Sequence, residues 1–245
     1  MSSSLLTALL LCACCLGCFI LLLRGTRKII AVAYTDKAKG RALFIRAAAF
    51  LAAWLLLLGI LSARGFFADF TKLPPRPGLA VLLPLPAVLM ISFSKTGKAL
   101  LRQAPPQWLI YLQSFRVFVE LIIWLAVLRG LLPKQMSFEG RNFDIISGLL
   151  ALPVGYYCFA KKRWPAAMVL LYNIVGLALL LNVLLISVLS MPTPLRAFHS
   201  GPDSSLVAQF PFIFLPGFLV PLAYSLHIFS LRQWAMGRVR RVAAA

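Results

Sequence analysis

Acidic side chains are scarce in this sequence, in which 6 Asp and Glu stand against 25 Lys and Arg. Charged residues of both signs make up only 13% of the chain, whereas 61% of the residues are apolar. A soluble fold of this length cannot bury so much apolar surface, but a bilayer is itself an apolar solvent and removes that requirement. The composition therefore predicts an all-α, multi-pass transmembrane helical bundle.

A long polar segment is also missing. The longest polar stretch has about twenty residues, which is too short to fold alone, so residues 1–245 are expected to form a single transmembrane domain. In a soluble protein the net charge of +19 would suggest nucleic acid. Because cytoplasmic loops of membrane proteins collect Lys and Arg, we expect no nucleic acid, and contact of the basic rim with the anionic headgroups of a lipid bilayer.

The motifs of common catalytic and metal sites are absent. The sequence has no phosphate-binding GxxxxGK[ST] loop, no HExxH, no GxSxG and no pair of CxxC motifs. Its two histidines, His199 and His227, are expected on opposite sides of the membrane, so they cannot share a metal ion or a haem. We therefore expect no metal site and no cofactor, and an enzymatic function is the least supported because no nucleophile–base set is visible.

Four of the five cysteines lie close together at Cys12, Cys14, Cys15 and Cys18, inside an apolar run. No His or acidic residue neighbours them, so a disulfide framework or a metal site is not expected. The run loosely resembles a lipoprotein signal, but signal peptides carry positive charge before their apolar core. Here the first basic residue, Arg24, follows the core. We expect a retained first helix with its N-terminus outside.

Seven apolar segments are expected to span the membrane. The third is irregular: it has only fifteen residues and contains Pro84 and Pro86, whereas a spanning helix needs about twenty residues. It is either a kinked span lengthened from its flanks or a re-entrant segment. The expected spans are 5–23, 42–61, 79–93, 108–128, 145–160, 166–189 and 210–231.

The distribution of basic residues gives the orientation. Segments 24–41, 94–107, 161–163 and 232–241 hold 16 Lys and Arg, and the opposite segments hold 7. This split predicts an external N-terminus and a cytoplasmic C-terminus. A bacterial inner membrane is the expected location. If the third segment were re-entrant, everything after it would change sides and the Arg-rich tail would lie outside, so seven spans are preferred.

Three polar residues, Gln113, Arg116 and Glu120, fall on one face of the fourth span. Arg116 and Glu120 are four residues apart, so they are expected to pair directly and to face the bundle interior. The face is either a site for a substrate, an ion or a proton, or a neutralised pair that fixes helix register. Arg46 in the second span either extends to the headgroups or helps to neutralise Glu120.

The loop that follows the fourth span is the second polar signal. Gly140 permits a turn with positive φ, and either Asn142 or Asp144 can cap the next helix. The loop is either a well-ordered turn or a gate resting above the fourth span. Its candidate site residues are Glu139, Arg141, Asn142 and Asp144. In the sixth span, Asn173 and Asn182 are expected to hydrogen-bond to neighbouring helices.

From Gln113 to about Leu152 the sequence resembles a family of uncharacterised bacterial integral membrane proteins. The resemblance lies in Gln113-Ser114-Phe115-Arg116, Glu120, Pro133, the segment Met136–Asp144 and Gly148-Leu149. It covers about forty of the 245 residues. The resemblance implies no activity, but it implies that the polar residues of the fourth span and of the following loop belong together.

Three functions remain open. The leading hypothesis is a small transporter-like or ligand-binding protein, with its polar pocket at Gln113, Arg116 and Glu120 beneath the loop Glu139–Asp144. There Arg116 would hold an anionic group or neutralise Glu120, and Glu120 would accept a proton. The second is a structural or accessory subunit with a membrane-protein partner. The third is a membrane-embedded enzyme acting on lipid.

Overall fold

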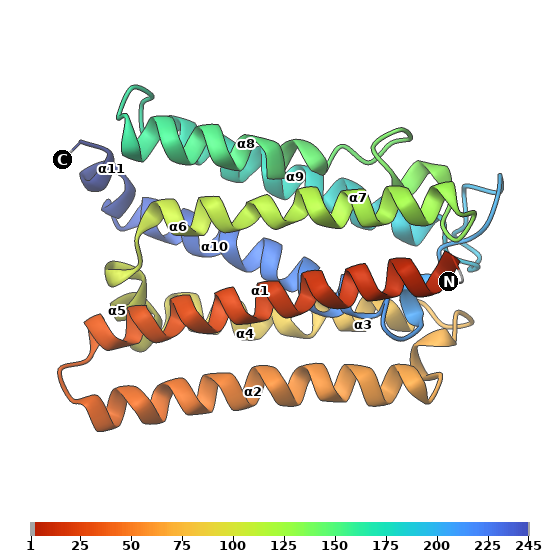
Figure 1. The fold of residues 1–245 in the computed structure, drawn as a ribbon, viewed down its shortest axis with the longest axis horizontal. Coiled ribbons are helices and arrows are strands. Elements are labelled where there is room, and N and C mark those ends of the chain that lie inside the picture. The colour runs from red at the N-terminus through yellow and green to blue at the C-terminus, as the bar shows by residue number, and fades with distance from the viewer. Residues whose placement is uncertain (1–2, 245) are drawn as a thin grey trace.

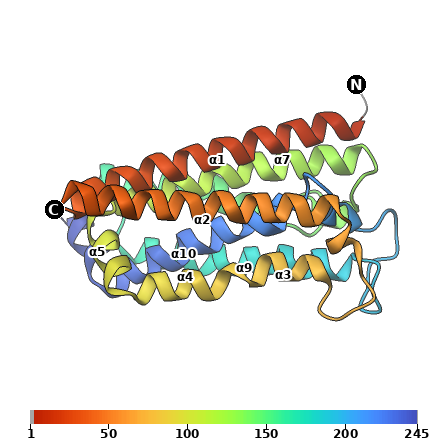
Figure 2. The ribbon, with the colours of Figure 1, turned by 90° about the horizontal axis from the view of Figure 1, so that it is seen from below.

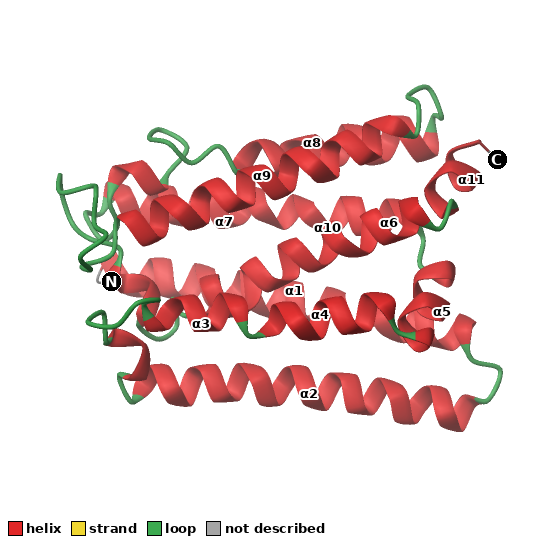
Figure 3. Ribbon diagram, turned by 180° about the vertical axis from the view of Figure 1, so that it is seen from behind, coloured by secondary structure: helices red, strands yellow, loops and turns green. Residues whose placement is uncertain are grey.

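A computed structural model describes residues 3–244, and every regular element in that range is a helix (Figure 3). Five helical stretches are long and apolar enough to cross a membrane. This length and composition agree with the predicted multi-pass helical bundle. The five stretches are Ser4–Ala33, Lys37–Ala63, Arg76–Phe93, Pro106–Leu128 and Ala167–Leu189.

The first two helices form a long hairpin at one edge of the bundle (Figures 1 and 2). Helix α1 (Ser3–Ala33) and helix α2 (Lys37–Ala63) both continue past their apolar runs into the basic segment between them. Asp36 ends this connection as the N-cap of α2, because its carboxylate accepts hydrogen bonds from two backbone amides of the first turn. Most of α2 is exposed, including Arg46, which therefore does not face the fourth span.

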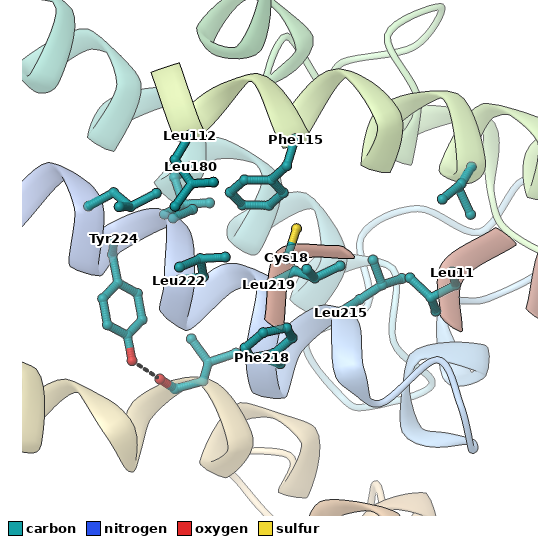
Figure 4. Close-up of a cluster of buried hydrophobic side chains, with 14 of the residues drawn as sticks. Leu11, Cys18, Leu112, Phe115, Leu180, Leu215, Phe218, Leu219, Leu222 and Tyr224 are labelled. Carbon is teal, nitrogen blue, oxygen red and sulfur yellow. Dashed lines mark hydrogen bonds between the residues drawn. The ribbon is translucent and has the colours of Figure 1, made fainter. Parts of the chain in front are cut away.

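The third apolar segment is a kinked helix in two parts, α3 (Arg76–Leu82) and α4 (Pro84–Phe93). It begins three residues before the expected start at Leu79. The helix is therefore kinked and lengthened from its flank, as the first of the two expected alternatives described. The kink follows from Pro84 and Pro86, which cannot donate backbone hydrogen bonds. Tyr224 donates its hydroxyl to the carbonyl of Val81 at 3.1 Å, just before the break (Figure 4).

A short helix, α5 (Lys95–Gln103), occupies a segment for which we expected a loop. Ser94 caps its N-terminus by accepting from the amide of Gly97. At its C-terminal end, the amide of Gln233 donates to the carbonyls of Leu101 and Ala104, each at 2.8 Å. These bonds satisfy carbonyls that the helix end leaves unpaired, and they attach α5 to the last long helix.

The fourth span runs through α6 (Pro106–Tyr111), a 3₁₀ turn and α7 (Phe115–Leu128). Helix α8 (Ile145–Gly155) continues in a π-helical turn to Ala160 and packs closely against it. A Cβ atom on Gly148 would stand 2.7 Å from Val117 Cγ2, and one on Gly155 would stand 2.4 Å from Tyr111 Cε1. Glycine at both positions lets α8 approach the fourth span.

Helix α9 (Ala167–Leu189) is followed by a long loop and by the segment expected to be the last span, which is broken like the third. It consists of a π-helical turn, Leu215–Leu219, and α10 (Val220–Ala235), and the tail adds α11 (Arg238–Ala244). Pro221 has no N–H to donate to the carbonyl of Gly217. Trp54 of α2 donates its indole N–H to that carbonyl at 2.8 Å, so the hairpin satisfies a group that the break leaves free.

The largest apolar core lies where α1, α7, α9 and α10 meet. Figure 4 shows Cys18 from α1 near Phe115 and Leu219, and Leu11 from the same helix near Leu215. All five cysteines are free thiols, and Cys18 packs in this core as a small apolar side chain. The two ends of the chain lie at opposite ends of the bundle (Figure 1).

Candidate functional site: a buried polar cluster

Arg116, near the start of α7, has its guanidinium almost completely enclosed, with 2% of the residue exposed. Its Nε donates to Asp144 Oδ2 at 2.7 Å, and its Nη2 donates to Asp144 Oδ1. Nη2 also donates to the carbonyl of Gly176 at 3.3 Å. This bidentate arrangement places both oxygens of one carboxylate on one guanidinium, which is the strongest form of an Arg–carboxylate contact.

His227 of α10 contacts the same guanidinium. Its Nε2 lies 2.9 Å from Arg116 Nη1, and its Nδ1 lies 2.9 Å from Asn173 Oδ1. Arginine can only donate, so Nε2 accepts and the ring proton is on Nδ1, which donates to Asn173. The imidazole is therefore neutral. Asn173 in turn donates to the hydroxyl of Ser230 at 2.9 Å, which confirms the predicted hydrogen bond between helices.

The close approach of α9 to this cluster depends on Gly176. A Cβ atom on Gly176 would lie 2.4 Å from Cε1 and 2.6 Å from Nε2 of His227. Any larger side chain would push the imidazole away from Arg116. A glycine inside the apolar α9 is thus explained by the space that the histidine needs.

Glu120, one turn further along α7, is held by a different partner. Both of its carboxylate oxygens accept from Asn142 Nδ2, at 2.7 and 2.9 Å. The same amide nitrogen donates to the carbonyl of Met136, and Asn142 Oδ1 accepts from the backbone N–H of Asp144. Only 1% of Glu120 is exposed. The loop after the fourth span therefore supplies the partners of both charged residues of α7.

The predicted direct pair of Arg116 and Glu120 is wrong. Both residues face the interior and meet the loop, as expected, but among residues 3–244 the ion pair of Arg116 is with Asp144. The reason is geometric. Because α8 packs closely on α7 at Gly148, Asp144 at the start of α8 comes within bidentate reach of Arg116. A pair within α7 would leave the buried carboxylate of Asp144 without its cation.

Two details of the loop also differ from expectation. Gly140 does not have a positive φ; a Cβ atom there would lie 2.3 Å from the carbonyl oxygen of Lys134. The glycine is required by close backbone approach. Asp144 is the N-cap residue of α8, but its side chain makes no capping hydrogen bond, since both oxygens are bound to Arg116.

The remaining predicted residues lie apart from the cluster. Gln113 is buried but turns to α10, where its amide donates to the carbonyl of Ala223 at 3.0 Å. Glu139 is exposed. Arg141 is also exposed; its guanidinium lies over the ring of Phe198, and its carbonyl accepts from Asn182 at 2.8 Å. Asn182 therefore bonds to this loop, whereas a bond to a neighbouring helix was expected.

His227 was not predicted to belong to the site. The sequence signal was available, because an ionisable residue inside a span usually faces the bundle interior and a partner. That signal could not identify Arg116 as the partner of His227, because the two residues are 111 positions apart in the sequence.

A cavity of about 90 Å³ lies against this cluster. Arg116, Glu120 and Asp144 line its polar side. Mostly apolar side chains line the rest, from α3, α7, α9, the broken last segment and the loops beside them. That volume holds several water molecules or a small organic group. Pro77 and Gly78 of α3 and Pro216 of the π-helical turn also line it. Both Pro-broken spans therefore border the cavity.

Comparison with known protein families places most of this chain in one family. Residues 77–235 match a family described as a domain of unknown function, DUF8737. The match covers more than half of the sequence, and the chain belongs to this family. The matched region contains the whole polar cluster but not the hairpin of α1 and α2. A search of curated proteins found no match, and a search of solved structures found none either.

Proposed function

We propose that this member of the DUF8737 family is a small transporter-like or ligand-binding membrane protein, and that its site is the cavity beside Glu120. The observation that supports this most directly is the position of the cavity. Charged side chains enclosed in the bundle line one side of the cavity, and broken helices border it. Irregular helices at membrane depth are tolerated where they line a cavity, and binding sites of transporters use such helices.

The proposal includes a topology of seven spans with an external N-terminus and a cytoplasmic C-terminus, in a bacterial inner membrane. Opposite positions of the two chain ends support an odd number of crossings. The shorter apolar helix Ile145–Ala160 and the broken span ending in α10 would be the two crossings beyond the five long stretches. The resemblance of residues 113–152 to uncharacterised bacterial membrane proteins is consistent with that location. The basic end of the bundle would contact anionic headgroups.

A water-filled cavity distinguishes this proposal from its main alternative. In a variant whose five native cysteines are replaced by serine or alanine, Ser187→Cys introduces a thiol on the cavity wall. We expect a membrane-impermeant thiol reagent to label it in intact cells, because only a hydrated thiol ionises and reacts. Leu185→Cys, two residues away on the exposed face of α9, is the matched control and should remain unlabelled in lipid.

If Ser187→Cys reacts no faster than Leu185→Cys, the cavity is dry or closed and the proposal fails. That outcome would favour a structural or accessory subunit with a membrane-protein partner. One observation supports this alternative: α2 has only three buried residues, Gly40, Leu58 and Ser62. A helix that is so little covered offers a long apolar face to a partner or to lipid.

A further inference from the structure

The buried cluster contains more acid than base. Glu120 and Asp144 are both carboxylates, and Arg116 is the single formally charged cation that contacts either of them among residues 3–244. His227 adds no charge, because its Nε2 accepts a hydrogen bond from Arg116. Protonation of that nitrogen would direct an N–H at the guanidinium. With both carboxylates ionised, the cluster is short of one positive charge.

Four of the five N–H groups of Arg116 are already bound within the protein. Its Nε and Nη2 are bound to Asp144, its Nη2 also to Gly176, and its Nη1 to His227. An incoming carboxylate or phosphate could use the second N–H of Nη1, but a bidentate contact would have to displace Asp144, which would then be buried without a cation. Arg116 therefore offers an anionic ligand one unbound N–H, and its charge is already paired with Asp144.

Among the described residues, Glu120 is the carboxyl group of the cluster that has no cation in contact with it. Its partner Asn142 is an uncharged amide, and one amide nitrogen serves both carboxylate oxygens. A carboxylate has about four lone-pair sites, so Glu120 keeps capacity to accept further hydrogen bonds. Burial of an uncompensated carboxylate is unfavourable, and a positive ligand would relieve that cost.

The cavity walls limit what this positive group can be. Away from the polar side they are formed by side chains such as Val119, Ile123, Leu180, Leu184 and Leu219. Hard metal cations take six or more oxygen ligands, and the described residues contain no group of three or more His, Cys, Asp or Glu suited to a metal ion. An organic ammonium needs one carboxylate for its charge and apolar walls for its carbon atoms.

We infer that the cavity binds a small, apolar organic ammonium ion, with Glu120 as its counter-ion. The inference rests on the proposed function, because it requires an accessible cavity. It goes beyond that proposal by naming the ligand class and the residue that selects it. Arg116, Asp144 and His227 act as positioning residues that hold α7, α8 and α10 around the cavity.

The experiment compares three probes of the same chain length on the purified full-length protein: n-butylammonium, 1-butanol and n-butyrate. A ligand that binds only the folded state raises the melting temperature in a saturable way. We expect n-butylammonium to do so, and the alcohol and the carboxylate to have little effect. Glu120→Gln should abolish the rise. Glu139→Gln removes an exposed carboxylate from the neighbouring loop and should leave the rise unchanged.

Leu184→Trp keeps Glu120 but fills the cavity, so it should also abolish the rise, and it provides the test if Glu120→Gln does not fold. The inference is overturned if butyrate or butanol stabilises as much as the ammonium, if the ammonium gives no rise, or if the rise survives in a folded Glu120→Gln or Leu184→Trp variant. Labelling of Ser187→Cys separates the two proposals. A reactive thiol without an ammonium effect removes only the ligand class, whereas an unreactive thiol removes both.

Discussion

Arg116 and Asp144 are 28 residues apart in the sequence, and they form a bidentate ion pair in the interior of the bundle. The pair joins α7 to the first turn of α8, and its other contacts reach α9 at Gly176 and α10 at His227. One guanidinium therefore connects four helices. Removal of either charge leaves the other without compensation in an apolar surrounding.

The first prediction concerns this pair. Arg116→Gln and Asp144→Asn should each destabilise the protein by about 3–5 kcal/mol, and the double variant should cost clearly less than the sum. The measurement is a double-mutant cycle on unfolding in detergent. The coupling free energy from this cycle is compared with that from a second cycle, which combines Arg116→Gln with Glu120→Gln. A larger coupling in that second cycle would restore the pair within α7 and contradict the structure.

The second prediction concerns the space beside His227. Gly176→Ala should cost about 1–3 kcal/mol of stability, because the added Cβ meets the imidazole. His227→Ala removes the atoms that the Cβ meets, so Gly176→Ala should cost less in that background. Gly17→Ala is the control, since a Cβ there has nothing within 4 Å, and it should be neutral or slightly stabilising. Equal effects on stability at both glycines would show that the contact with the imidazole contributes nothing.

The third prediction concerns the contact between the hairpin and the broken last span. Trp54→Phe should lower stability by about 1–3 kcal/mol, because the carbonyl of Gly217 then lacks a donor. Pro221→Ala supplies a backbone N–H at the position that can reach this carbonyl. In the Pro221→Ala background, Trp54→Phe should therefore cost less. If the cost is the same in both backgrounds, the indole acts through packing and not through its hydrogen bond.

The fourth prediction concerns topology. A reporter fused after Ala245 should be cytoplasmic, and one fused before Met1 should be external, because the segments predicted to be cytoplasmic hold 16 Lys and Arg and those predicted to be external hold 7. The assay is a pair of reporters that are active on opposite sides of the membrane. An external C-terminal reporter would refute seven spans and would identify α3–α4 as the segment that does not cross.

The sequence by itself determined the helical class, the positions of the apolar stretches and the interior location of Arg116 and Glu120. These features follow from local rules: apolar runs of sufficient length form helices in lipid, and charged residues within them turn from lipid to the interior. The loop 138–144 was correctly associated with the fourth span, although through a resemblance and not through a physical rule. Helix α5 was missed because its nine residues lack an apolar run of spanning length.

Only the tertiary structure decided which charges are partners. Helical periodicity relates residues within one helix, so it favoured Glu120 as the partner of Arg116. It contains no information on how closely a second helix approaches. Gly148 and Gly176 allow α8 and α9 to pack closely, which brings Asp144, Asn173 and His227 to Arg116 and leaves Glu120 with Asn142 beside the cavity. The charge balance of the site, and hence the ligand it favours, depends on these long-range contacts.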